Sequence, residues 1–176
     1  MSDKDIVPLI AADTIAARVR ELAREIAQAS AKSLTAVVAL EGAFVFAADL
    51  LRALKAEGVA LKVHTLRLSS YGRGTSPAGA VTAEDAAQLE IAGEDVLLID
   101  DIVDSGHTLA KARAILQERG AKRVRAAALL DKPSRRQANE RADYVGFTVE
   151  DVFVVGYGMD LAGRYRELPF IGTVKA

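Results

Sequence analysis

The sequence predicts an α/β domain whose mostly parallel sheet is flanked by helices. Segments with strand and helix patterns alternate along the chain, and this order is typical of a parallel sheet with helical crossovers. The strand candidates are short runs of almost only apolar residues, such as 35–40, which indicate strands covered on both faces. Four strand candidates run directly into charged or glycine-containing segments. In parallel sheets ligands bind at the carboxyl ends of the strands, so chemistry is expected there.

The first expected element is an amphipathic helix over 13–29. Its apolar residues recur at helical spacing, and Asp13 or Thr14 can cap its start. Further helices are expected over 43–56 and 108–119, ending at Gly58 and Gly120. The strands are expected over 35–40, 59–70, 96–99, 124–130 and 153–156. The segment 131–142 reads as a polar, basic connection, and the tail from Asp160 onward as irregular.

The segment 71–80 interrupts this pattern. It holds three glycines and a proline without an apolar period, which is typical of a mobile loop or a hairpin tip. The ambiguous segment 81–90 is expected to form the second arm of that hairpin.

Length and composition exclude several classes of protein. The 176 residues are enough for one domain and one core, and 51% hydrophobic with 27% charged residues is a globular balance. Because the chain has no cysteine, it has no disulfide, thiolate zinc site or cysteine nucleophile. The net charge of -1 argues against a nucleic-acid partner held by bulk electrostatics. Neither a signal peptide nor an apolar run of membrane-spanning length is evident, so a cytoplasmic protein without a membrane partner is expected.

The richest strand end is 100–108. Two adjacent carboxylates, Asp100 and Asp101, end an apolar strand, and a short loop then leads into a helix. The backbone N–H groups of 105–108 and the helix start together form a phosphate cradle, in which Gly106 permits close approach. Carboxylates suit sugar hydroxyls, a metal or a developing cation beside the phosphate. Cradle and acids therefore suggest a sugar phosphate as ligand.

This segment, IDDIVDSGHT, resembles the phosphoribosyl pyrophosphate signature of the type I phosphoribosyltransferases. Further segments are similar to the hypoxanthine (hypoxanthine-guanine) phosphoribosyltransferases: SSYG, LLDKPSRR, DYVGF, FVVGYGMD and RYRELPFIG. The resemblance runs from about 39 to 173, in family order. It implies a single phosphoribosyltransferase domain over 1–176, with a hairpin lid near 69–84 and a small hood near 150–176 formed with the chain ends. It also implies transfer of the phosphoribosyl group from phosphoribosyl pyrophosphate to hypoxanthine or guanine, giving IMP or GMP and pyrophosphate in purine salvage.

The resemblance assigns roles to the residues of the signature. Asp100 and Asp101 match the acidic pair that holds the ribose hydroxyls, and both are also expected at the metal site. Asp104 matches the general base that takes or shares the purine N7 proton. The cradle for the 5′-phosphate is Ser105, Gly106, His107 and Thr108, and His107 is expected to act through its backbone.

Later segments match the base, metal and lid positions of the family. Lys132 matches the donor to the purine 6-oxo group, Phe153 the ring that stacks on the base, and Val154 a backbone contact to it. Asp160 matches a ligand of Mg²⁺, which prefers oxygen ligands. Ser70 and Tyr71 match the start of the lid, which would keep water from the activated ribose.

The pyrophosphate site contains one departure from the family pattern. Gly42, Arg136 and Arg166 are expected around pyrophosphate, together with Glu41, where relatives often carry Lys or Arg. Because an inward carboxylate would repel pyrophosphate, we expect the turn to act through its backbone N–H groups and Glu41 to point away. A second departure is Asp100, where Glu is common; the shorter side chain should be tolerated.

Two alternative functions stay open, and an oligomeric state is expected. Xanthine could be preferred over hypoxanthine and guanine, since the residues do not rank these bases. A non-catalytic RNA-binding regulator shares the fold but should present a basic face, unlike a chain with a pI near 6.2. Apolar surface on the expected helix 43–56 and near the chain ends suggests a homodimer or homotetramer.

Overall fold

The computed structural model describes residues 6–30, 32–69, 80–81 and 86–175. Its main sheet has the strand order β4-β3-β2-β5-β6-β7. The central strands are β2 (Ser33–Leu40), β5 (Asp95–Val103) and β6 (Arg123–Asp131), and all three run parallel. β3 (Ala60–Ser69) and β7 (Tyr144–Thr148) extend the parallel part on either side. The predicted α/β fold with a mostly parallel sheet is confirmed.

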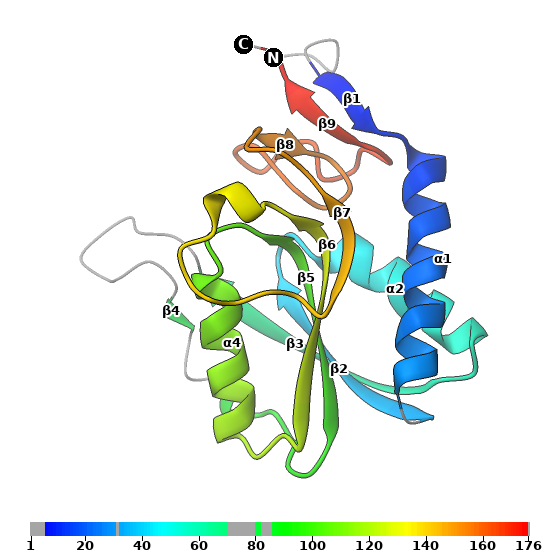
Figure 1. The fold of residues 1–176 in the computed structure, drawn as a ribbon, viewed down its shortest axis with the longest axis vertical. Coiled ribbons are helices and arrows are strands. Elements are labelled where there is room, and N and C mark those ends of the chain that lie inside the picture. The colour runs from blue at the N-terminus through cyan, green and yellow to red at the C-terminus, as the bar shows by residue number, and fades with distance from the viewer. Residues whose placement is uncertain (1–5, 31, 70–79, 82–85, 176) are drawn as a thin grey trace.

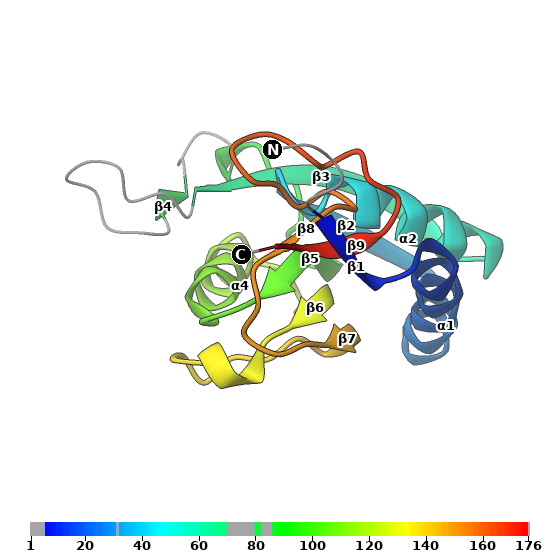
Figure 2. The same ribbon diagram turned by 90° about the horizontal axis from the view of Figure 1, so that it is seen from above.

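Helices cover both faces of this sheet (Figure 1 and Figure 2). α1 (Ala12–Ala29) and α2 (Phe44–Ala56) lie on one face, and α4 (His107–Glu118) lies on the other. The alternating residues of β2 confirm that both faces are buried: Leu34, Ala36 and Val38 join the core with α1 and α2, while Val37 and Ala39 join the core with α4.

The core under α2 rests on large, fully buried side chains. Phe46, Leu50 and Leu54 are each 0% exposed. Burying such a side chain contributes roughly 1.5–3 kcal/mol. This packing fixes α2, and with it the turn at 41–43 that enters the functional site.

A second, three-stranded sheet stands above the carboxyl ends of the main strands (Figure 1). β1 (Ile6–Ile10) and β8 (Val154–Val155) flank β9 (Ile171–Val174), and both pairings are antiparallel. This sheet is the expected hood built from the two chain ends. The strand expected at 153–156 belongs to this sheet as β8 and not to the main sheet.

Three strands differ from the sequence expectation. β1 and β7 were not expected as strands, and the tail that was expected to be irregular contains β9. β7 joins the edge of the main sheet, where Arg18 of α1 donates to the carbonyl oxygens of Val145 and Gly146 at 2.9 and 3.0 Å.

The strand pairing of the expected hairpin is short. β4 (Ala80–Val81) pairs antiparallel with the end of β3, but residues 86–90 are not a strand, so the second arm is shorter than the expected 81–90. A 3-10 turn, η2 (Pro133–Arg135), lies within the expected connection after β6. The expected lid residues Ser70 and Tyr71 lie outside the described residues.

Candidate active site

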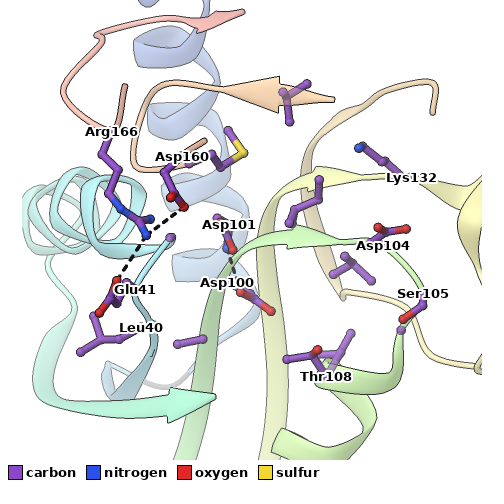
Figure 3. A pocket seen from close by; sticks show the side chains of 18 of the residues that line it. Leu40, Glu41, Asp100, Asp101, Asp104, Ser105, Thr108, Lys132, Asp160 and Arg166 are labelled. Carbon is purple, nitrogen blue, oxygen red and sulfur yellow. Dashed lines mark hydrogen bonds and ion pairs between the residues drawn. The ribbon is translucent and has the colours of Figure 1, made fainter. Parts of the chain in front are cut away.

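A cavity of about 730 Å³ lies between the carboxyl ends of β2, β5 and β6 and the small sheet. It is the place where ligands bind in parallel sheets. Figure 3 shows side chains from the predicted strand ends converging on it. The cavity is lined by the predicted residues Glu41, Gly42, Asp100, Asp101, Asp104, Ser105, Gly106, Thr108, Lys132, Phe153, Val154, Asp160 and Arg166.

The floor of the cavity carries the two carboxylates at the end of β5. Asp100 is 7% exposed, and its Oδ1 accepts a hydrogen bond from the backbone N–H of Asp101 at 3.0 Å. Burial, together with the charge of Asp101, raises the pKa of Asp100 well above its usual range. Burial also raises the pKa of Asp101, although the nearby Arg166 opposes that rise. This pair, one acid buried and the other partly buried, is destabilised as bare carboxylates and is suited to a ligand that brings hydroxyls or positive charge.

Gly42 is required by its contact with this pair. A side chain at position 42 would place its Cβ 1.8 Å from Oδ2 of Asp101. The turn at 41–43 therefore approaches the carboxylate as closely as only glycine allows.

The expected cradle residues 105–108 form the end of the loop after β5 and the first turn of α4. Gly106 caps α4 with a left-handed backbone, φ +87°, and Ser105, Gly106 and Thr108 line the cavity. The start of α4 presents backbone N–H groups and the positive end of the helix dipole, which favour an anion. The ring of His107 faces Gln137, with its Nε2 3.3 Å from Oε1, so its side chain is turned to the loop behind.

Asp104 stands at the entrance of the same loop. Its Oδ1 accepts from Nε of Arg135 at 3.1 Å, and Nη1 of Arg135 lies 3.4 Å from Oδ2 of Asp151. Half-exposed Asp104 therefore keeps access to the cavity while one arginine holds its carboxylate.

Lys132 is buried at the opposite wall. It is 7% exposed, and its Nζ donates to the carbonyl oxygen of Val152 at 2.7 Å. That bond holds the ammonium group at the segment that contains Phe153 and Val154. Both of these residues line the cavity, and Phe153 is exposed. A buried cation and an exposed aromatic ring that line the same cavity suit a flat, polar heterocycle.

Arg136 lies away from the position expected for it. Its Nη2 pairs with Oδ1 of Asp131, both side chains are largely buried, and it is absent from the cavity lining. Its Cδ would lie 3.1 Å from a Cβ at Gly106, so the arginine packs behind the anion loop. The placement of Arg136 at pyrophosphate was wrong because the carboxylate of Asp131 holds it underneath.

Glu41 also differs from the expectation. Its Oε2 lies 3.2 Å from Nη2 of Arg166, and Figure 3 shows the two side chains pointing toward each other. The expectation that Glu41 points away from the cavity was wrong, because the positively charged side chain of Arg166 lies beside the 41–43 turn and attracts the carboxylate.

Two arginines of the site were not predicted. Arg67, near the carboxyl end of β3, lines the cavity, and Arg135 contacts Asp104. Arg67 pairs in register with Leu40, so its position at a strand end next to Glu41 was the signal that could have found it.

Comparisons with known proteins agree with this geometry. The model of the phosphoribosyl transferase domain family matches residues 10–161. The hypoxanthine phosphoribosyltransferase of Escherichia coli K12 is 44% identical over 163 residues, covering 91% of this chain and 90% of that protein. The hypoxanthine-guanine phosphoribosyltransferase of Bacillus subtilis is 40% identical over 168 residues, covering 95% of this chain and 92% of that protein.

A solved structure shows the same fold with a product bound. The hypoxanthine phosphoribosyltransferase of Trypanosoma cruzi in complex with IMP superposes with a TM-score of 0.88 at 30% identity, covering 99% of this chain and 97% of that one. From these matches and from the site that the strand ends build, the chain belongs to the phosphoribosyltransferase family, in its hypoxanthine (hypoxanthine-guanine) branch.

Proposed function

We propose that this protein transfers the 5-phosphoribosyl group of phosphoribosyl pyrophosphate to hypoxanthine, guanine or both, forming IMP or GMP and pyrophosphate in purine salvage. One observation carries the proposal: a single cavity is lined by an anion loop, by one buried and one partly buried carboxylate, and by a buried lysine and an exposed phenylalanine. A sugar phosphate fits the first two features and a 6-oxopurine fits the last. The names of the relatives and the IMP complex support the same reaction.

Asp100 and Asp101 are suited to hold the ribose hydroxyls. In the reaction the bond from C1′ to the pyrophosphate oxygen breaks and its electron pair leaves with pyrophosphate, while N9 of the purine bonds to C1′. Positive charge develops on the ribose ring, as in other glycosyl transfers. Carboxylates fixed beside that ring stabilise the transition state more than the ground state.

Asp104 is placed to accept the proton that the purine loses. Its carboxylate lines the cavity next to the anion loop, and Arg135 holds it in one orientation. A positioned base of this kind contributes typically 10²–10⁴-fold to the rate.

Lys132 and Phe153 are suited to select the base. The ammonium group of Lys132 is a donor only, so it favours the 6-oxo group over the 6-amino group of adenine. Phe153 offers its exposed ring for stacking, and the buried Val154 offers its backbone. A buried donor facing the wrong group costs roughly 1–3 kcal/mol, which rejects adenine.

The remaining groups are suited to the two phosphate ends of the substrate. Ser105, Gly106 and Thr108 would bind the 5′-phosphate at the start of α4. Arg166 and the turn at Gly42 would bind pyrophosphate, with Arg67 on the same wall.

The donor set fits Mg²⁺. Asp160 lies in the cavity wall beside Arg166, and Asp100 and Asp101 form its floor. No group of three or more such side chains gathers around one point in the described residues, but Mg²⁺ is commonly held by one or two carboxylates with waters and substrate phosphates. When bound, the ion would neutralise the charge of the leaving pyrophosphate.

Self-association as a homodimer or homotetramer is part of the proposal. Phe44 at the start of α2 is 46% exposed and borders a groove with Val45, Leu168 and Pro169. Such a groove is suited to a second copy of this chain.

As for a membrane, no helix within the described ranges combines the length and the apolarity that a crossing needs.

The proposed activity is tested by a steady-state assay with phosphoribosyl pyrophosphate, Mg²⁺ and each of four bases. We expect nucleotide formation with hypoxanthine or guanine and none with adenine. A dominant rate with xanthine would move the specificity to that base. Absence of turnover, with salt-dependent binding of RNA, would instead favour the regulatory alternative.

A further inference from the structure

Glu41 forms an ion pair with Arg166, the arginine that is suited to bind pyrophosphate. Oε2 of Glu41 lies 3.2 Å from Nη2 of Arg166, and the glutamate side chain is 68% exposed while the arginine side chain is 24% exposed. Both residues line the cavity. The exposed carboxylate thus reaches inward from the rim to a guanidinium that is largely covered.

Arg166 is held on three sides. Its Nη1 donates to the carbonyl oxygen of Gly158 at 2.7 Å, and its Nη2 also lies 2.9 Å from Oδ1 of Asp160. The Gly158 anchor packs directly on the 41–43 turn, because a Cβ there would lie 2.2 Å from the carbonyl oxygen of Gly42. The guanidinium therefore stays next to the 41–43 turn, where Glu41 meets it.

Nη2 of Arg166 already lies near two carboxylates, those of Glu41 and Asp160. An anion that approaches this atom therefore competes with Glu41, and a displaced Glu41 carboxylate stays close on the same turn. An exposed ion pair is weak, so it can be displaced, but it lowers the net attraction of the site for an anion.

We propose that Glu41 acts as an internal competitor of pyrophosphate at Arg166, weakening pyrophosphate binding and hastening its release. This inference rests on the proposed function, since it takes Arg166 as the pyrophosphate-binding cation. It makes Glu41 a residue that tunes substrate and product affinity and takes no part in bond making.

The test is the inhibition constant of pyrophosphate against phosphoribosyl pyrophosphate for three proteins. We expect Glu41→Gln to lower that constant about three- to tenfold, which corresponds to the loss of one exposed pair plus one repulsive charge. Glu41→Lys, which reverses the charge, should lower it further. Glu118→Gln, at the exposed end of α4 far from the cavity, removes the same charge and should leave it unchanged.

Arg166→Gln separates the inference from its premise. If that variant weakens pyrophosphate while Glu41→Gln does not strengthen it, the competition by Glu41 is overturned and the role of Arg166 stands. If Arg166→Gln leaves pyrophosphate binding unchanged, the inference falls with its premise, while turnover of hypoxanthine in the same assay leaves the proposed function intact. Calorimetric titration of Mg²⁺-pyrophosphate into each folded variant gives the same comparison without turnover.

Discussion

At the scale of single residues, the site works by holding charged groups in fixed surroundings. Asp104 is tied to Arg135 at 3.1 Å, and Lys132 is tied to the carbonyl of Val152 at 2.7 Å. A base and a donor that are already oriented lose little entropy when the substrate arrives. Both assignments can be tested without altering the fold, because each side chain points into the cavity wall.

Replacing Asp104 by Asn should lower kcat by about 10²–10⁴-fold, because the amide cannot take the purine proton. The KM for phosphoribosyl pyrophosphate should change little, since the anion loop is untouched. Asp151→Asn, which alters the other partner of Arg135, serves as the matched control. Unchanged turnover in the Asp104 variant would remove it from the role of base.

Sequence alone predicted most of the residues that line the cavity but not the directions of two side chains. The strand-end positions of Asp100, Lys132 and Asp160 follow from chain order and strand pattern. The directions of Arg136 and Glu41 depend on partners distant in sequence or across a turn, Asp131 and Arg166. A local pattern does not contain such pairings.

At the scale of elements, the anion loop depends on one backbone conformation. Gly106 has φ +87°, and a Cβ there would meet Arg136 at 3.1 Å and Ala138 at 3.4 Å. The segment behind the loop donates to it, since the N–H groups of Gln137 and Ala138 bond the carbonyl of Ser105 at 2.9 Å. The loop is therefore shaped by packing from behind as well as by its own sequence.

Gly106→Ala should destabilise the protein by about 1–3 kcal/mol, because alanine is strained at this angle and the neighbours leave little space. It should also raise the KM for phosphoribosyl pyrophosphate, since the N–H groups would shift. Urea unfolding and steady-state kinetics measure both effects. Gly58→Ala, also at positive φ (+83°) but with open space around it and away from the cavity, controls for strain alone and should keep the KM. An equal rise in KM in both variants would refute the special role of the loop.

The elements that sequence missed are edge or short strands. β7 has a glycine at its centre, Gly146, where a Cβ would lie 2.4 Å from the carbonyl of Leu129, and its residues are only partly buried. β1 and β9 pair across nearly the whole length of the chain. Weak local patterns and long-range pairing hide such strands, whereas the fully buried β2 and β5 show themselves as apolar runs.

At the scale of the whole molecule, the adjacent carboxylates of Asp100 and Asp101 link the stability of the fold to pH. The pKa of Asp100 is raised by burial and by Asp101, so the folded state holds its proton at pH values where the unfolded state releases it. The protonated Asp100 contributes its full stability at pH values below the pKa that this residue has in the unfolded chain. That contribution is lost as the pH rises through the pKa that it has in the folded protein.

Asp100→Asn should therefore raise the melting temperature of the unliganded protein more at pH 7 than at pH 4, because the neutral amide removes the cost of ionisation. The same variant should lose turnover, since it alters the pair beside the ribose. Calorimetric melting curves at the two pH values measure the first effect. Asp95→Asn, paired with Arg123 at the opposite end of β5, is the control. A Tm gain in the Asp100 variant equal at both pH values would contradict the linkage.

The central claim is that this cavity binds a 6-oxopurine through Lys132 and joins it to phosphoribose. The most direct test is the ratio of kcat/KM for hypoxanthine to that for adenine, measured for the wild type and for Lys132→Gln. We expect a ratio of at least about 100 in the wild type, falling at least tenfold in the variant, which can both donate and accept. A ratio near one in the wild type, or an unchanged ratio in the variant, would contradict the assignment of the base site.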